Sequence, residues 1–140
     1  MQLFQLVFVS SFVDAYGYDL NSLLHLSSLG NEHSDVKGMT LFANGNILQL
    51  LQGEPSAVQR VYGILPSQSK QFQVIKMTEE FVVGAALQES CMGLDAQGFK
   101  TLAKEPMPIP IFRLSAAAIS QRIGHSMGCD LALQFVELHS

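Results

Sequence analysis

The sequence predicts an α+β fold in which a mixed β-sheet carries two helices on one face, and three observations lead to this prediction. First, segments with strand and helix periodicity follow one another in the order β-α-β-β-α-β-β. Second, the dipeptide Asn44-Gly45 lies between two apolar runs, as in a tight hairpin. Third, the pattern changes after residue 93, where prolines and separate helical segments begin. This order is that of a ferredoxin-like sandwich with a helical C-terminal extension.

The composition is that of one well-buried globular chain. Of its 140 residues, 48% are hydrophobic and 14% are charged, which suffices for a single core. A net charge of −4 and eight scattered basic residues exclude the usual basic surface of a nucleic-acid-binding protein. Because so lightly charged a surface favours self-association, we predict a homo-oligomer.

The start of the chain and its two cysteines indicate a cytoplasmic protein. Residues 1–15 lack the basic segment and cleavage site of a signal peptide. No apolar run reaches the roughly 18 residues that a membrane span needs. Cys91 and Cys129 stand far apart without a CxxC spacing, so we predict buried free thiols rather than a disulfide or a metal site.

The first elements are a strand and a helix. Residues 3–9 carry apolar side chains on both faces, which predicts a central strand. After a loop, Asp19 is a good N-cap for a helix that ends near Gly30 and Asn31. The leucines of this helix recur at helical spacing, at positions 20, 23, 24 and 26.

The middle of the chain begins with the hairpin. Strands are predicted at 36–43 and 47–52, on either side of Asn44-Gly45. A second helix begins at Pro55 or Ser56 and is expected to end at Pro66 and the run of residues 67–69 that follows it. Two more strands are predicted at 72–77 and 81–87, with a turn at residues 78–80 between them.

Residues 94–140 form the predicted extension to a domain of residues 1–93. A short helix is predicted at 95–104, and prolines then impose an extended segment. Ser115 can cap a further helix, which glycines at 124 and 128 weaken before a helical stretch at 130–138. Because the extension is too short for a core of its own, we expect it to pack on the sheet or on a partner.

Gln49 is out of place in its strand, where Ile47 and Leu51 share its face. A buried amide without partners costs about 1–3 kcal/mol. Gln49 is therefore paired either with another part of the protein or with a ligand. The rest of the chain offers little chemistry: the four histidines have no ligand spacing, and no serine lies in a nucleophile motif. We predict no metal site, no catalytic residues and no enzyme.

Three segments together resemble the BLUF domain, a family of flavin-binding blue-light sensors. They are MQLFQLVFVS (1–10), NEHSDVKGMTLF (31–42) and LQLLQGE (48–54). The family has the patterns Asn-x-x-x-x-[Ile/Val]-Thr-Gly-x-Leu-x-[Phe/Tyr] and Phe-x-Gln-x-Leu-Glu-Gly-Pro in the corresponding order. The resemblance runs from residue 1 to about residue 92 on the same succession of elements.

The resemblance implies a flavin site with FAD or FMN between the two helices. In the family an Asn and a Gln bind the flavin ring, and these positions correspond to Asn31 and Gln49. A Tyr on the first strand supplies an electron and a proton to the excited flavin, and the Gln then rearranges. That position is Phe8 here, and Phe has no hydroxyl to donate. The chain also departs from the residues that the family has at the positions of Lys37, Gln52, SQSK (67–70) and SCM (90–92).

Three hypotheses follow. The first is a BLUF-like, single-domain signalling or interaction protein that is insensitive to light because Phe8 replaces the photoactive Tyr, with or without a bound flavin. The second is a working flavin-based blue-light photoreceptor with an unusual or engineered first strand, which relays a signal to a partner protein. The third is an enzyme on the same fold, which no paired acid and base supports. Asn31, Gln49 and Phe8 are the candidate cofactor-binding positions.

Overall fold

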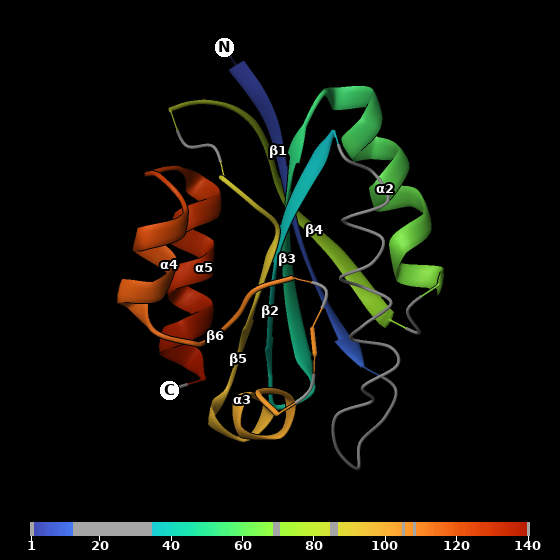
Figure 1. The fold of residues 1–140 in the computed structure, drawn as a ribbon. Helices are drawn as coiled ribbons and strands as arrows, with labels where there is room; N and C mark the ends of the chain where they lie inside the picture. Colours follow the sequence, from blue (N-terminus) through green and yellow to red (C-terminus); the bar gives the residue numbers. More distant parts are fainter. Residues whose placement is uncertain are drawn as a thin grey trace.

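A computed structural model describes residues 2–12, 35–68, 71–84, 87–104, 106–107 and 109–139. The predicted first helix and Asn31 lie outside these residues. The structure has three layers, with a central sheet between helix α2 on one side and helices α4 and α5 on the other (Figure 1). The mixed α+β architecture predicted from the sequence is confirmed. None of the described helices combines the length and the apolar character that a membrane span needs.

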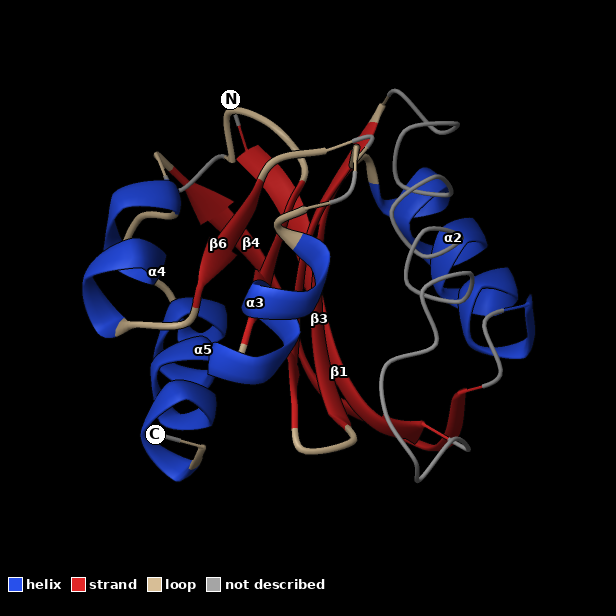
Figure 2. Ribbon diagram, turned by 60° about the horizontal axis from the view of Figure 1, so that its bottom comes forward, coloured by secondary structure: helices blue, strands red, loops and turns tan. Residues whose placement is uncertain are grey.

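The described part of the sheet has six strands in the spatial order β4-β1-β3-β2-β5-β6. The four neighbours β4, β1, β3 and β2 pair antiparallel, whereas β5 pairs parallel with β2 and β6 parallel with β5. The strands are β1 (Gln2–Phe12), β2 (Val36–Ala43), β3 (Asn46–Gly53), β4 (Gln71–Val83), β5 (Cys91–Leu94) and β6 (Ile111–Arg113). Figure 2 shows them as one twisted sheet.

The turn between β2 and β3 has the predicted form. Asn44 and Gly45 have φ angles of 53° and 81°, both in the left-handed region that a two-residue type I′ turn requires. The turn makes Ala43 and Asn46 the first pair of the hairpin, and every later pair follows from it. The register of the two strands is therefore set locally, by two residues.

One prediction about the middle of the chain is wrong. Residues 78–80 are not a turn, because β4 is one strand of 13 residues that pairs with β1 over most of its length. An irregularity opposite Val7 and Phe8 accommodates Met77 as an extra residue. The predicted end of the second helix is confirmed, because α2 (Pro55–Gln68) ends within residues 66–69. A proline so close to the end of a helix removes one backbone hydrogen bond without stopping the last turn.

The extension follows the predicted succession of helices and adds one strand. Helix α3 (Ala96–Leu102) is capped by Asp95, and α4 (Ala116–Arg122) is capped by Ser115 as predicted. The break after α4 is also confirmed, and α5 (Met127–Leu138) begins at a second cap, Ser126. The proline segment was expected to be extended only, but its end forms β6 beside β5.

Each face of the sheet carries its own apolar cluster. Side chains of β1, β2 and β3 pack with Ala57, Val58 and Val61 of α2 in the first cluster. In the second, the opposite faces of the same strands pack with Ile119 of α4 and Phe135 of α5. The central strands are therefore buried on both sides. Both thiols lie in the second cluster and are free, as predicted.

A buried polar network attaches the start of α5 to the sheet. The Gln52 amide donates to Gln5 Oε1 at 2.7 Å, and Gln5 Nε2 donates to Ser126 Oγ at 3.1 Å. The Glu80 carboxylate accepts the backbone N–H groups of Met127 and Gly128 at 3.3 and 3.2 Å. Helix α5 therefore docks through directional bonds as well as apolar contact.

Replacing Gly128 by alanine is expected to destabilise the protein by about 1–3 kcal/mol, the usual cost of overpacking. A Cβ there would lie 2.3 Å from Gln5 Nε2, which is held in the network and cannot withdraw without breaking it. The matched control is Gly63→Ala in α2, where a Cβ would meet nothing within 4 Å. That change should stabilise the helix by roughly 0.5–1 kcal/mol. Urea unfolding measures both, and equal effects would contradict the network.

Candidate functional site

Two of the three predicted site residues lie side by side on the face of the sheet that α2 covers. Phe8 of β1 is paired with Gln49 of β3, and Gln49 is paired on its other side with Thr40 of β2. The exposed fractions of the three side chains are 0%, 2% and 5%. The third predicted residue, Asn31, lies outside the described residues. The structure therefore forms a buried row of three residues, Phe8, Gln49 and Thr40, across three adjacent strands.

Thr40 provides a hydrogen-bond partner for the buried amide of Gln49. The Gln49 Nε2 amide donates to Thr40 Oγ1 at 3.2 Å, inside an otherwise apolar surface. Thr40 is not among the site residues predicted from the sequence. Its position was nevertheless predictable, because a two-residue turn at Asn44-Gly45 places residue 40 opposite residue 49. Parallel pairing with β5 then continues the row to Met92, which is fully buried.

Tyr62 of α2 lies against the other end of the row. Its ring meets that of Phe8 edge-on, with centroids 5.1 Å apart and planes at 61°. The Lys76 ammonium lies 5.3 Å from the centroid of the Tyr62 ring and forms an ion pair with Glu79. Hydrogen bonding between the two charged groups raises the pKa of Lys76 and lowers that of Glu79. Position 8 thus has no hydroxyl of its own, but a phenol packs directly against it.

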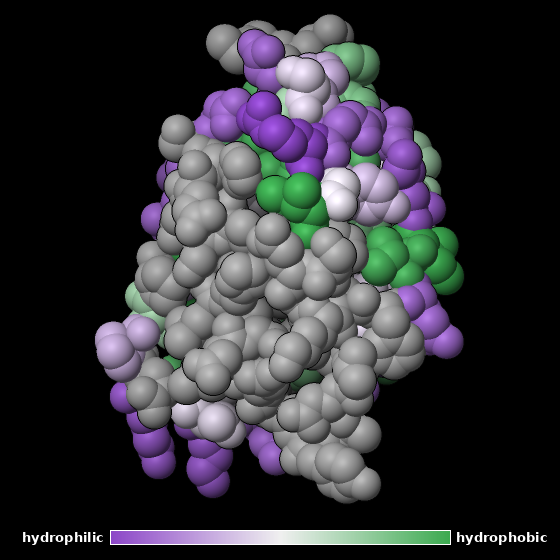
Figure 3. Space-filling model, turned by 90° about the vertical axis from the view of Figure 1, so that its right-hand side faces the viewer, coloured by the Kyte–Doolittle hydropathy of each residue, from purple (hydrophilic) through white to green (hydrophobic). Residues whose placement is uncertain are grey.

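The geometry of the row suits the edge of a flat heterocycle. An amide supplies two donors and an acceptor, so Gln49 can exchange bonds with a ring that has both kinds of group. Around Gln49, one hydroxyl comes from Thr40. Met92 and the neighbouring aromatic side chains form a largely apolar wall. Figure 3 views the molecule from the α2 side, where hydrophobic areas interrupt a largely hydrophilic described surface.

Comparison with protein families identifies the family to which this fold belongs. The model of the family described as "BLUF: Sensors of blue-light using FAD" matches residues 3–93. The chain belongs to the BLUF family. Members of this family bind FAD or FMN. By sequence, no curated protein matches the chain.

Solved BLUF structures share the fold at low sequence identity. The structure named BlrP1 BLUF has a TM-score of 0.55 and 21% identity, over 67% of this chain and 64% of that one. Klebsiella pneumoniae BlrP1 in a manganese and cyclic diGMP complex has a TM-score of 0.67 and 16% identity, over 96% of this chain but only 33% of that one. BlrB, a BLUF protein in its dark state, has a TM-score of 0.56 and 16% identity, over 74% and 80%. The BLUF chain therefore spans less than two thirds of the length of both BlrP1 chains.

The donor set of the row fits a flavin. Gln49 retains the amide that the BLUF pattern places against the ring, with Thr40 and Met92 beside it on the same face. What differs is position 8, where the wall is a hydrocarbon ring.

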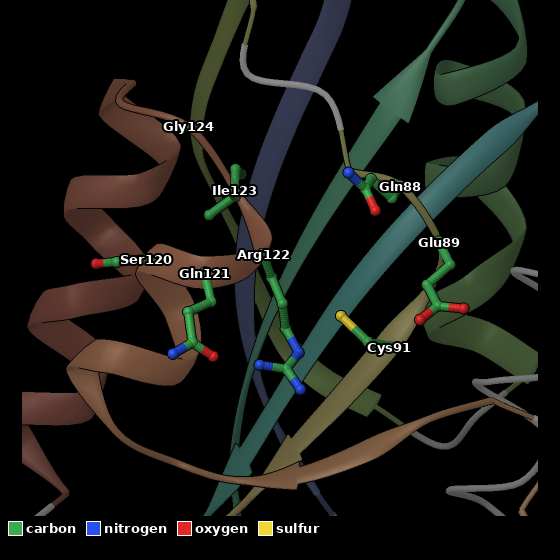
Figure 4. Close-up of a pocket in the computed structure, with 8 residues that line it drawn as sticks. All are labelled: Gln88, Glu89, Cys91, Ser120, Gln121, Arg122, Ile123 and Gly124. Atoms are coloured by element: carbon green, nitrogen blue, oxygen red, sulfur yellow. The ribbon is translucent and has the colours of Figure 1, made fainter.

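A separate cavity of about 250 Å³ lies on the other side of the sheet, between α4 and the start of β5 (Figure 4). The side chains of Arg122 and Cys91 extend into the same space. Arg122 also lies 4.0 Å from the centroid of the Phe112 ring. Burial raises the pKa of the Cys91 thiol from 9.0 to about 11, which Arg122 opposes and Glu89 reinforces. A thiol with so high a pKa is a poor nucleophile at neutral pH.

The hydrogen bond between Gln49 and Thr40 predicts a measurable coupling. Thr40→Val should cost about 1–2 kcal/mol, because a buried amide donor loses a partner. Gln49→Met should cost less in the Thr40→Val background than alone, with a coupling of about 0.5–1.5 kcal/mol. Urea unfolding of the two single variants and the double variant gives the cycle. Strictly additive effects would show that the bond contributes nothing.

The Cys91 thiol predicts a loss of stability at alkaline pH. Between pH 9 and 11 the unfolded thiol is ionised while the folded one keeps its proton, so the free energy of unfolding falls as the pH rises. The pKa difference corresponds to about 2 kcal/mol over this range. Cys91→Ala should show a correspondingly smaller fall, with Cys129→Ala as the comparison. Identical slopes for the parent and Cys91→Ala would contradict the shift.

Proposed function

We propose that this BLUF protein is a signalling or interaction module that has lost the normal light response. The observation that carries the proposal is the buried Phe8 paired with Gln49. In the family, as the resemblance implies, a Tyr at this position passes an electron and a proton to the excited flavin, and the Gln rearranges. The proposed output is contact with another protein rather than catalysis by this chain.

The loss has a direct chemical reason. A phenyl ring has no hydroxyl, so Phe8 neither hydrogen-bonds the Gln49 amide nor transfers a proton. The amide instead donates to Thr40, a group that light does not change. Gln49 is thereby held in one arrangement, and the step that begins signalling in the family has no trigger.

The proposal includes retention of FAD or FMN. A bound flavin would supply the absorption of blue light and the capacity to accept an electron. Gln49 would orient the ring by its amide, Thr40 would hold that amide, and Met92 with Phe8 would provide the apolar wall that excludes water. These roles belong to side chains that are already buried and aligned on one face of the sheet.

One contact favours a second candidate, a working photoreceptor. The ring of Tyr62 lies against that of Phe8, so a phenol remains within one aromatic ring of the position where the family has its Tyr. Under this alternative Tyr62 would be the electron donor, and its proton would need a path that does not use position 8.

The absorption spectrum of the purified protein, recorded after incubation with excess FAD or FMN, tests the proposal. We expect a bound flavin with no reversible red-shift under blue light, and a red-shift in Phe8→Tyr. The matched control is Phe4→Tyr, which adds a phenol to the same strand and face roughly 13 Å away. It should leave the flavin unresponsive.

The remaining outcomes separate the hypotheses. A reversible red-shift in the unaltered protein would refute the loss of response, and its disappearance in Tyr62→Phe would establish the second candidate. A protein that stays colourless after incubation with flavin would exclude both a photoreceptor and retention of the cofactor.

A further inference from the structure

The outer edge of β4 is exposed and apolar. In the described part of the chain, β4 ends the sheet on one side, and its 13 residues pair only with β1. Four of the six exposed large hydrophobic side chains there belong to β4: Ile75, Met77, Phe81 and Val83, which are 46–71% exposed. Natural proteins usually protect an edge strand by shortness, charge or a covering element. β4 has charged residues and a bulge at Met77, but it is long and, in the described residues, no element covers its outer edge. That edge can therefore accept another strand.

The charged side chains of β4 indicate which strand would pair with its outer edge. Because Met77 is an extra residue, Lys76 is paired with Phe8 and Glu79 with Leu6, so both charged side chains lie on the α2 face. The two exposed charges are thus of opposite sign, on one face and symmetric about the Met77–Thr78 bond. Within one chain these two side chains form an ion pair with each other. A strand that meets this edge antiparallel and presents the same two charges would give each of them a second, opposite charge as a neighbour.

We propose that β4 pairs antiparallel with β4 of a second copy of the chain, in the register that sets Lys76 opposite Glu79 of the other copy. The two-fold symmetry then makes two such ion pairs, and the two sheets continue as one. In this register Ile75 meets Glu80 and Val74 meets Phe81, and each of these two pairs joins side chains on the same face. A shift by two residues would set Lys76 opposite Phe81 or Met77, and neither charge would then meet an opposite charge of the other copy.

The same register brings apolar groups to an apolar groove. A groove of about 550 Å³ lies at the start of β4, and its lining includes Val9, Ile47, Val74, Ile75 and Phe135. The second copy's strand would run alongside this groove with its Phe81 opposite Val74. Pairing would therefore cover the exposed ring of Phe81 with an apolar side chain of the same strand in the other copy.

The edge also accounts for where a homo-oligomer can form. The sheet face opposite α2 is covered by α4 and α5 of the same chain. The edge of β4 carries most of the large apolar side chains that remain exposed in the described residues. This inference does not depend on light or on a bound flavin.

A charge-reversal experiment tests the register directly. Sedimentation equilibrium or light scattering over a range of concentrations should show a dimer for the unaltered protein. Lys76→Glu and Glu79→Lys each replace two attractive pairs by two repulsive ones, and each should raise the dimer Kd roughly tenfold or more. An equimolar mixture of the two variants should dimerise again. In the mixed dimer the glutamate introduced in one copy meets the lysine introduced in the other, and the second pair joins the native Lys76 and Glu79.

The controls use the same charge changes away from the edge. Lys104→Glu and Glu89→Lys lie on exposed turns and should leave the dimer unchanged, alone or mixed. The Lys76 and Glu79 side chains are 41% and 33% exposed, so their variants should keep the native circular dichroism. Loss of the exposed ion pair within the chain should lower the melting temperature only slightly. A monomeric unaltered protein, single variants that dimerise like the parent, or a mixture that stays monomeric would each overturn the proposal.

Discussion

The register of the β2–β3 hairpin is the constraint on which the rest of the site depends. Two residues with positive φ, Asn44 and Gly45, close the turn and so determine that Thr40 faces Gln49. A slip by one residue would move every side chain of β3 to the other face of the sheet. Gln49 would then lie among the residues that pack on α5, away from Phe8 and α2. The local geometry of the turn thus specifies the buried hydrogen bond between the Gln49 amide and the Thr40 hydroxyl.

Strand β3 places a glutamine side chain on each face of the sheet. On the α2 face Gln49 is held by Thr40, and on the α5 face Gln52 is held by Gln5 and by the backbone of Leu87. The first amide belongs to the row that suits a flavin, and the second belongs to the network that docks α5. Alternation along one strand therefore connects a cofactor-type surface and the C-terminal helices through one short stretch of backbone.

The site was predictable where it depends on local pattern, and unpredictable where it depends on long-range pairing. Gln49 stood out because its neighbours are apolar, and Phe8 was located through the resemblance of residues 1–10 to the BLUF first strand. Thr40 followed from the turn but was overlooked. The contact of Tyr62 with Phe8 could not be predicted. Helical spacing shows which side of α2 is apolar, but not which aromatic side chain of the sheet Tyr62 contacts. The continuous β4 was missed because its charged middle, Thr78 to Glu80, has the composition of a turn.

The sequence by itself determined the α+β class, the hairpin, the cap at Ser115 and the family, since each of these depends on residues that are neighbours in the sequence. Tertiary structure alone decided that β4 continues through residues 78–80, because pairing with the long β1 and the bonds from Glu80 to α5 outweigh local turn propensity. It also decided that the bulge at Met77 brings Lys76 and Glu79 to one face. Side-chain direction after a bulge depends on the partner strand, and that partner lies about 70 residues away along the chain.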